Sequence, residues 1–121
     1  MVTSPSKDSL SEIMKRLDVF REERDWARFH NLKDLAAAIS IEAGELQEIF
    51  LWVEQASCNT LLETRIGAVK DELADIMIQC LNFARAAGID VVQAMNHKID
   101  DNEGKYPVER AKGAATKYSE L

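Results

Sequence analysis

Apolar side chains recur along this chain at the spacing of an α-helix in four separate segments. A helix turns about 100° per residue, so apolar residues three or four positions apart lie on one face. The sequence shows neither the strict alternation of a β-strand nor an internal repeat. It therefore predicts an all-α fold, a bundle of about four helices. The four helices are expected at residues 9–26, 32–55, 60–87 and 90–101.

Residues typical of helix ends mark these limits. Asn31 is a suitable N-cap for the second helix, and Asp90 is one for the fourth. Thr60 and Glu63 have the spacing of a capping box at the start of the third helix. Gly88 follows the last periodic residue of that helix and is expected to end it.

The remainder of the chain is polar. Residues 1–8 are expected to be a disordered N-terminal segment, residues 9–112 a single helical domain, and residues 113–121 a C-terminal tail. With 121 residues, 46% of them hydrophobic, the chain is long enough to form a core.

The third predicted helix is apolar on two sides. Ile78 and Leu81 lie nearly opposite Ile76, Cys80 and Phe83 on a helical wheel. Cys80 is expected in the core. A helix that is apolar on two sides must be covered on two sides, and four helices in one chain cannot easily do this. We therefore predict that this helix also forms a subunit contact.

Composition and charge exclude several classes of partner. The net charge is −6, from 21 acidic and 15 basic residues, and no long basic run suggests a nucleic-acid polymer as partner. Cys58 and Cys80 are too far apart for a CxxC motif, which favours two reduced thiols in a cytoplasmic protein. The opening residues lack the apolar stretch of a signal peptide, and no apolar run approaches the roughly 20 residues of a membrane span.

Carboxylates occupy positions where the second helix should be apolar. Glu42 falls inside the apolar stripe and Glu45 lies at its edge, and a buried carboxylate is costly unless it is paired or binds a metal. On the third helix, Glu72 and Asp75 have the same spacing of three. Residues three apart share a face, so the two pairs can converge between neighbouring antiparallel helices. Oxygen ligands suit Mg²⁺, with Mn²⁺ as a possible substitute, and Mg²⁺ points toward phosphate chemistry.

The spacing alone also allows a second interpretation, in which these acids are ordinary residues of acidic helices and bind no metal. ExxE and ExxD also occur by chance in acidic helices, and Glu45 with Glu48 gives an overlapping match. A di-iron site is excluded because it needs Glu-x-x-His pairs, and neither His30 nor His97 follows a glutamate by three.

Two further groups of residues fit a nucleotide. Trp26, Phe29 and Trp52 flank the acids in the sequence, and indoles provide stacking surfaces for a flat base. Near the end of the fourth helix, cations and hydrogen-bond donors follow one another at helical spacing and can hold a polyphosphate. They are Lys98, Asn102, Lys105 and Tyr106.

Taken in order, these motifs resemble a known family. The residues that carry the resemblance are Ser40-Ile-Glu42-Ala-Gly-Glu45-Leu, Trp52, Glu72-Leu-Ala-Asp75 and Lys98-x-x-x-Asn102-x-x-Lys105-Tyr106-Pro107-Val, together with Arg24-Asp-Trp26-x-x-Phe29-His30. They are similar to the MazG-like nucleoside triphosphate pyrophosphatases, and within them to the small dCTP-pyrophosphatase-type members. The similarity covers about residues 9–112.

The resemblance implies hydrolysis of a (deoxy)nucleoside triphosphate to the monophosphate and pyrophosphate, in nucleotide-pool house-cleaning. It implies a homodimer or a dimer of dimers with an active site completed across subunits. It also implies roles for particular residues: Mg²⁺ at Glu42, Glu45, Glu72 and Asp75, base and sugar contacts at Trp26, His30 and Trp52, and phosphate contacts at Lys98, Asn102 and Tyr106. Gln79 departs from relatives that have an aromatic residue there, so the base preference stays open.

A mechanism follows as a hypothesis. A carboxylate orients the water that attacks the α-phosphorus, and Glu45 and Glu48 are the candidates because each lies at the edge of the acidic face. Two alternative functions remain. One is a non-enzymatic helical oligomer whose acids are ordinary ion-pair partners. The other is an enzyme acting on phosphoribosyl-ATP, which would be expected to lack the Trp26 and Trp52 pair.

Overall fold

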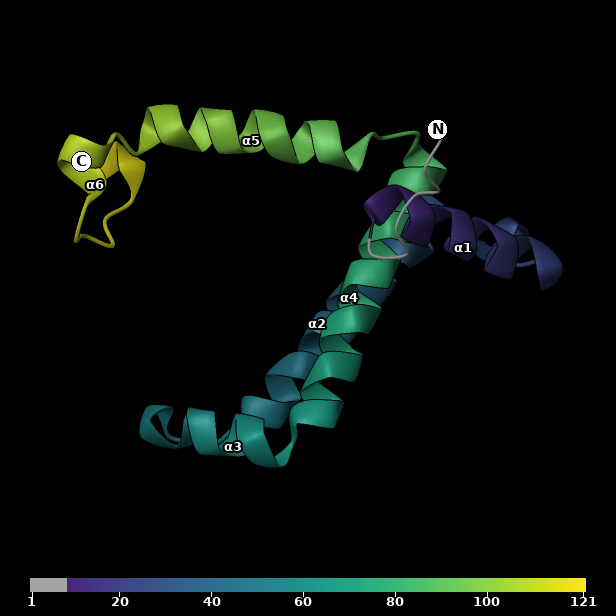
Figure 1. Ribbon diagram of the computed structural model, residues 1–121, viewed down its shortest axis with the longest axis horizontal. Helices are drawn as coiled ribbons and strands as arrows, with labels where there is room; N and C mark the ends of the chain where they lie inside the picture. The colour runs from purple at the N-terminus through teal and green to yellow at the C-terminus, as the bar shows by residue number, and fades with distance from the viewer. Residues whose placement is uncertain (1–8) are drawn as a thin grey trace, which may run out of the picture. The chain divides into compact units, whose positions relative to one another are not determined.

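The computed structural model describes residues 9–121, and over these residues it contains helices and turns but no strand (Figure 1). This confirms the predicted all-α fold class. The prediction for residues 1–8 falls outside the described residues. The helices are α1 Leu10–Glu23, α2 Leu32–Phe50, α3 Cys58–Thr64, α4 Ile66–Ala87, α5 Val91–Lys105 and α6 Val108–Ala111, with short 3₁₀ turns at Ala27–Phe29, Gln55–Ser57 and Tyr118–Glu120.

The predicted caps fix several helix ends. The Asn31 side chain accepts a hydrogen bond from the backbone N–H of Asp34 at 2.9 Å, and Asp90 accepts one from Gln93 at 3.0 Å. Each satisfies a backbone donor of the first turn that has no partner inside the helix. Gly88 ends α4 in the left-handed region, with φ 67°, where glycine bears no steric penalty.

The predicted helix at 60–87 is wrong in one respect, because the structure divides it into α3 and α4 at Arg65. Arg65 leaves helical geometry with φ −122° and ψ 27°. The hydroxyl of Thr64, one residue earlier, donates to the carbonyl of Leu61 at 3.0 Å, a side-chain bond that competes with a regular helix. The capping box at Thr60 is also wrong, since α3 already begins at Cys58.

Two other helix ends differ from the prediction. Helix α2 ends at Phe50 rather than near residue 55, because Leu51 is extended and Trp52 has φ 66°. Helix α5 continues to Lys105, beyond the predicted end at residue 101. Apolar spacing does not locate the ends of these two helices, because a helix end depends on the backbone angles of a few residues.

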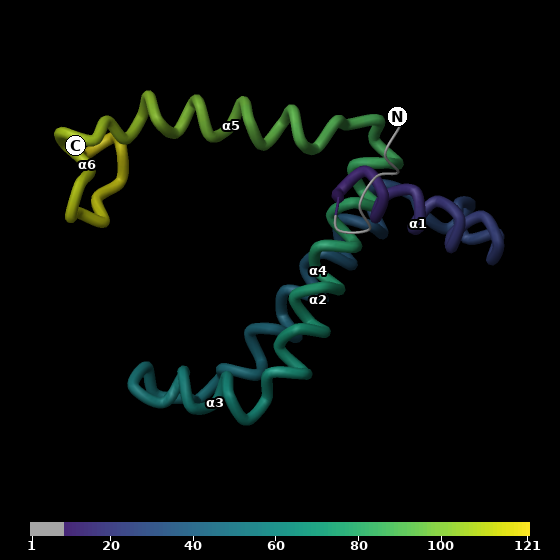
Figure 2. Tube along the Cα trace, viewed as in Figure 1, coloured from purple at the N-terminus to yellow at the C-terminus, as the bar shows by residue number. Residues whose placement is uncertain are grey.

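The chain forms two compact units, Met1–Gly88 and Ile89–Leu121. In the first unit α2 and α4 run side by side in opposite directions along most of their length (Figures 1 and 2). Helix α1 is tied to the end of α4 by Asp18, which accepts from Arg85 at 2.9 and 2.7 Å and from Arg21 at 2.7 Å. The predicted domain limits, 9–112, stay a prediction.

Few residues are buried in the single chain. Among the described residues, the buried hydrophobic ones are Leu35, Leu81 and Ala84, where the start of α2 meets the end of α4. On the middle of α4, Leu73 and Met77 are half-exposed, and Cys80, expected in the core, is exposed. Within the described part of the chain, no helix is long and apolar enough to cross a membrane.

Candidate functional site

Three glutamates converge where α2 and α4 pack against each other. Glu42 and Glu45 come from α2 and Glu72 comes from α4, and one carboxylate oxygen of each lies within 4.8 Å of the others. The spacing of three places the first two on one face of α2, and the antiparallel packing brings Glu72 opposite to them. We call these three residues the acidic cluster.

Among residues 9–121, two oxygens of the acidic cluster have no hydrogen-bond partner. Glu42 Oε2 and Glu72 Oε2 are buried and accept no hydrogen bond. Burial raises the pKa of Glu42 and of Glu72 above the ordinary 4.5, and the adjacent Glu45 carboxylate raises both further. The negative charges of Glu45 and Asp75 act on both pKa values in the same direction. The ionised cluster is therefore unfavourable by itself.

The acidic cluster fits a hard divalent cation. Its donors are carboxylate oxygens, the ligand type of Mg²⁺ and Mn²⁺, and two of them are buried and unpaired. A cation placed among them would satisfy these oxygens and offset their mutual repulsion. Asp75 is not one of the three clustered residues, but it is near enough for its charge to act on both Glu42 and Glu72.

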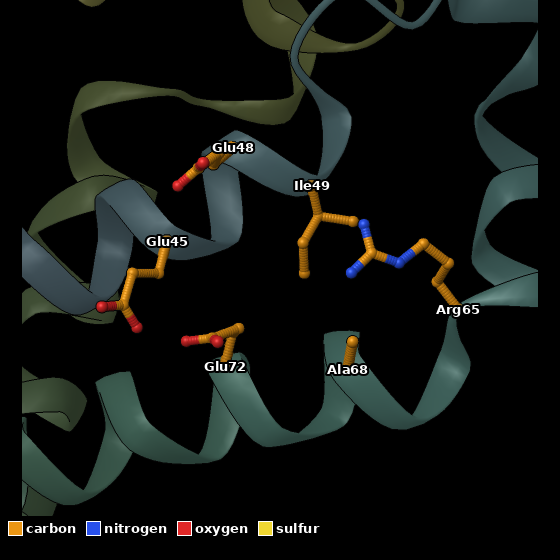
Figure 3. A pocket seen from close by; sticks show the side chains of 6 residues that line it. All are labelled: Glu45, Glu48, Ile49, Arg65, Ala68 and Glu72. Carbon is orange, nitrogen blue, oxygen red and sulfur yellow. The ribbon is translucent and has the colours of Figure 1, made fainter.

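A cavity of about 410 Å³ opens beside the acidic cluster. In Figure 3 the carboxylates of Glu45 and Glu72 approach each other from the two helices, whereas the Glu48 carboxylate is turned in another direction. Glu48 thus lines the cavity without belonging to the cluster. The lining residues are Glu45, Glu48, Ile49, Arg65, Ala68 and Glu72.

The residues predicted to contact the base and sugar lie at two places in the first unit. Trp26 follows α1 and packs edge-on against Phe20, with ring centroids 5.5 Å apart. Trp52 lies at the other end of α2, where its side chain is 93% exposed. The structure of the single chain therefore does not bring the two indoles together.

His30 lies in a separate cavity of about 250 Å³ that it shares with Arg21, Asn82 and Arg85. Its Nδ1 atom is buried and has no hydrogen-bond partner within the described part of the chain. Burial lowers the pKa of His30 below the ordinary 6.5, and the positive charge of Arg21 lowers it further. Both effects favour the neutral imidazole.

The residues predicted to contact the phosphates lie in the second unit. Lys98, Asn102 and Lys105 are on α5, and Tyr106 follows it. Lys105 Nζ lies 4.8 Å from the ring centroid of Tyr118, and the Tyr106 and Tyr118 rings meet edge-on at 6.0 Å. The structure describes this unit by itself, so the convergence of these side chains with the acidic cluster stays a prediction.

Arg65 and Asn82 are two polar residues that line the cavities of the first unit and that were not predicted from the sequence. Both are seven positions from a predicted acid of α4: Arg65 precedes Glu72 and Asn82 follows Asp75. Seven residues are nearly two helical turns, so this spacing was the available signal.

Fold and site together define an all-α protein with a carboxylate site between two antiparallel helices. The MazG-like family model matches residues 37–121. The dCTP pyrophosphatase 1 of Bos taurus is 35% identical over 118 residues, covering 96% of this chain and 70% of that protein. The protein of the same name from Homo sapiens is 31% identical over 115 residues, covering 93% of this chain and 68% of that one.

A solved structure agrees with these relatives. The crystal structure of a pyrophosphatase from Archaeoglobus fulgidus matches with a TM-score of 0.81 and 36% identity, over 88% of this chain and 98% of that chain. This chain belongs to the MazG-like family. The resemblance and the MazG-like fold predicted from the sequence are confirmed.

Proposed function

We propose that this protein is a Mg²⁺-dependent nucleoside triphosphate pyrophosphohydrolase. It hydrolyses a (deoxy)nucleoside triphosphate and water to the nucleoside monophosphate and pyrophosphate. The observation that carries the proposal is the acidic cluster, whose three carboxylates lie within 4.8 Å of one another in a chain similar to dCTP pyrophosphatases. We further propose that the protein acts in cytoplasmic nucleotide-pool house-cleaning, as inferred from the resemblance.

Glu42, Glu45, Glu72 and Asp75 would hold the cation. When bound, Mg²⁺ offsets the negative charge of the phosphate oxygens, including the charge that develops during the reaction. These carboxylates are held in place by α2 and α4, so the site is organised before the substrate arrives.

Glu48 is the better placed of the two candidates for the general base. It lines the cavity but is not part of the acidic cluster, which leaves its oxygens free to accept a proton. In this scheme Glu48 takes a proton from the attacking water as the new bond to the α-phosphorus forms. The bond from the α-phosphorus to the bridging oxygen breaks, and pyrophosphate leaves with the electron pair.

The remaining predicted residues would bind the substrate. We propose that Trp26, His30 and Trp52 contact the base and sugar, and that Lys98, Asn102, Lys105 and Tyr106 contact the phosphates. Trp26 and Trp52 lie near opposite ends of α2, so one nucleotide can use both only if subunits combine.

A second copy of this chain is the proposed partner for α4. Leu73 and Met77 are half-exposed in the middle of this helix, although both are large apolar side chains. Apolar surface of this kind favours association because burying it removes it from water. We propose a homodimer or a dimer of dimers in which these residues are covered.

A nucleotide screen tests the activity. Each (deoxy)nucleoside triphosphate is incubated with the protein in the presence of Mg²⁺ or of a chelator, and both products are quantified. Equal amounts of monophosphate and pyrophosphate, formed only with Mg²⁺, are expected. Release of inorganic phosphate from the γ-position, or no turnover of any nucleotide including phosphoribosyl-ATP, would contradict the proposal.

Glu42→Ala tests the site within the same assay. It removes a ligand from the acidic cluster and is expected to abolish turnover at every Mg²⁺ concentration. Glu63→Ala on α3 is the matched control, since it removes an exposed glutamate outside the cluster and should leave turnover unchanged. Near-normal activity of Glu42→Ala would count decisively against the assignment.

A further inference from the structure

Among the described residues that line the cavity beside the acidic cluster, Arg65 is the one basic residue. It stands at the break between α3 and α4, and Figure 3 shows its side chain reaching into the cavity toward Ile49. It therefore adds a positive charge to a cavity that three glutamates also line.

The position of Arg65 follows from the geometry of α4. Arg65, Ala68 and Glu72 are spaced three and four positions apart, so they form one stripe that faces α2. From Arg65 to Glu72 the stripe extends for about 10 Å. Ile49 of α2 faces the same part of the cavity as the small Ala68. The charged ends of this stretch are thus separated by a short section without charge.

The Arg65 guanidinium is not neutralised by the nearby acids. Across residues 9–121, the ion pairs shorter than 4.0 Å involve Arg21, Arg24, Arg28 and Arg85, and none involves Arg65. A guanidinium carries five N–H donors in a planar fork that matches a phosphate. Arg65 therefore keeps its donors available for an anion that enters the cavity.

We propose that Arg65 binds the β- and γ-phosphates of the substrate, the part that leaves as pyrophosphate. This inference rests on the proposed function. With the α-phosphate at the acidic cluster, the cavity directs the rest of the triphosphate along α4 to Arg65. The terminal phosphates of the bound nucleotide then lie toward the start of α4.

Product inhibition tests this assignment. The inhibition constants of pyrophosphate and of the nucleoside monophosphate are measured at fixed Mg²⁺ for the wild type and for Arg65→Ala. A hydrogen bond to a charged group is expected to change the affinity about tenfold or more. Arg65→Ala should therefore weaken pyrophosphate inhibition about tenfold or more, with an unchanged constant for the monophosphate.

Two further variants separate binding from a structural effect. Arg65→Lys keeps the charge but not the planar fork, so its pyrophosphate constant should lie between those of the wild type and Arg65→Ala. Lys70→Ala removes a positive charge from an exposed position of α4 that does not line the cavity, and should leave both constants unchanged. Thermal unfolding of each variant shows whether it is folded. If Arg65→Ala does not fold, the pyrophosphate inhibition constants of Arg65→Lys and Lys70→Ala are compared instead, and only that of Arg65→Lys should be weakened.

The outcomes distinguish this inference from the proposed function. If the wild type produces pyrophosphate while the Arg65 variants retain the wild-type pyrophosphate constant, Arg65 does not bind the leaving group. Equally weakened inhibition by pyrophosphate and by the monophosphate would also overturn the assignment. So would the same effect in Lys70→Ala. If the wild type forms no pyrophosphate from any nucleotide, the proposed function itself fails.

Discussion

Glu42 and Glu72 are two residues whose ionised side chains are unfavourable in the folded chain by itself. Each has a buried oxygen without a hydrogen-bond partner, and each has a raised pKa because of burial and of the neighbouring acids. Such an arrangement lowers the stability of the metal-free protein, but it holds the carboxylate ligands in position before a metal binds.

The raised pKa values predict how stability depends on pH. An acid whose pKa is higher in the folded than in the unfolded state binds more protons when folded, so stability falls as pH rises. Without metal, the free energy of unfolding should therefore fall as pH rises from about 4.5 through the raised pKa values. Denaturant titrations in a chelator at several pH values measure this change.

Magnesium should stabilise the folded protein, and more strongly at pH 7.5 than at pH 5. The reason is that the ion competes with protons for the same carboxylate oxygens. Thermal unfolding with and without MgCl₂ at the two pH values checks this. Glu42→Gln should reduce both the pH dependence and the effect of the ion. An identical Mg²⁺ effect at both pH values would contradict the prediction.

Trp52 combines an exposed side chain with a strained backbone. Its φ of 66° lies in the left-handed region, which costs most residues about 1–2 kcal/mol and which asparagine tolerates better. Trp52→Asn should therefore raise the free energy of unfolding by about 1 kcal/mol. If the indole stacks on the base, the same variant should bind substrate about 5- to 100-fold more weakly.

Trp52→Phe is the control, because phenylalanine keeps an aromatic ring and the strain. Its stability should match the wild type, and its substrate affinity should lie closer to the wild type than that of Trp52→Asn. Unfolding in urea and nucleotide titration measure the two quantities. Unchanged nucleotide affinity of Trp52→Asn would show that this residue does not contact the base.

At the scale of elements, Asp18 connects α1 to the end of α4. Its carboxylate accepts three hydrogen bonds from Arg85 and Arg21, and the Arg21 side chain is largely buried. Charge-assisted bonds of this type are stronger than neutral ones, although the partial exposure of Asp18 and Arg85 weakens them.

Asp18→Asn should therefore lower the free energy of unfolding by about 1–2 kcal/mol. Asp25→Asn is the matched control, because the ion pair of Asp25 with Arg28 is well exposed and should contribute little. Asparagine also tolerates the positive φ of Asp25. Urea unfolding at fixed protein concentration compares the two. Equal effects of the two substitutions would contradict a role for Asp18 in holding α1.

Apolar spacing located the helices better than it located their ends. It predicted one helix over residues 60–87, whereas the structure has a break at Arg65. Both α3 and α4 continue the apolar pattern, so the pattern does not register one residue with non-helical angles. The break has a consequence for the site, because it places Arg65 at the edge of the cavity.

At the scale of the whole molecule, the single chain leaves much of α4 uncovered. Leu73→Asp and Met77→Asp place a charge on half-exposed apolar positions and should convert the assembly to smaller species. Light scattering after size-exclusion chromatography measures the mass. Asp71→Lys, at an exposed position on another side of α4, should keep the wild-type mass. A monomeric wild type, or variants that assemble normally, would contradict the predicted contact.

The sequence by itself determined the helical class and the family, because both are recognised from the spacing and order of residues along the chain. Glu42 and Glu45 share a helical face at any position of that helix, and so do Glu72 and Asp75. The order of these motifs along the chain then carries the resemblance to the MazG-like family, which the comparisons confirm. The sequence did not determine which acids meet.

Tertiary structure decided that question, because contact between helices depends on how α2 and α4 align. The alignment brings Glu72 to Glu42 and Glu45, leaves Glu48 at the side of the cavity and adds Arg65 to it. It also decided which oxygens are buried without a partner. Spacing along a helix fixes the face on which a residue lies, whereas packing between helices fixes its neighbours and hence its charge state.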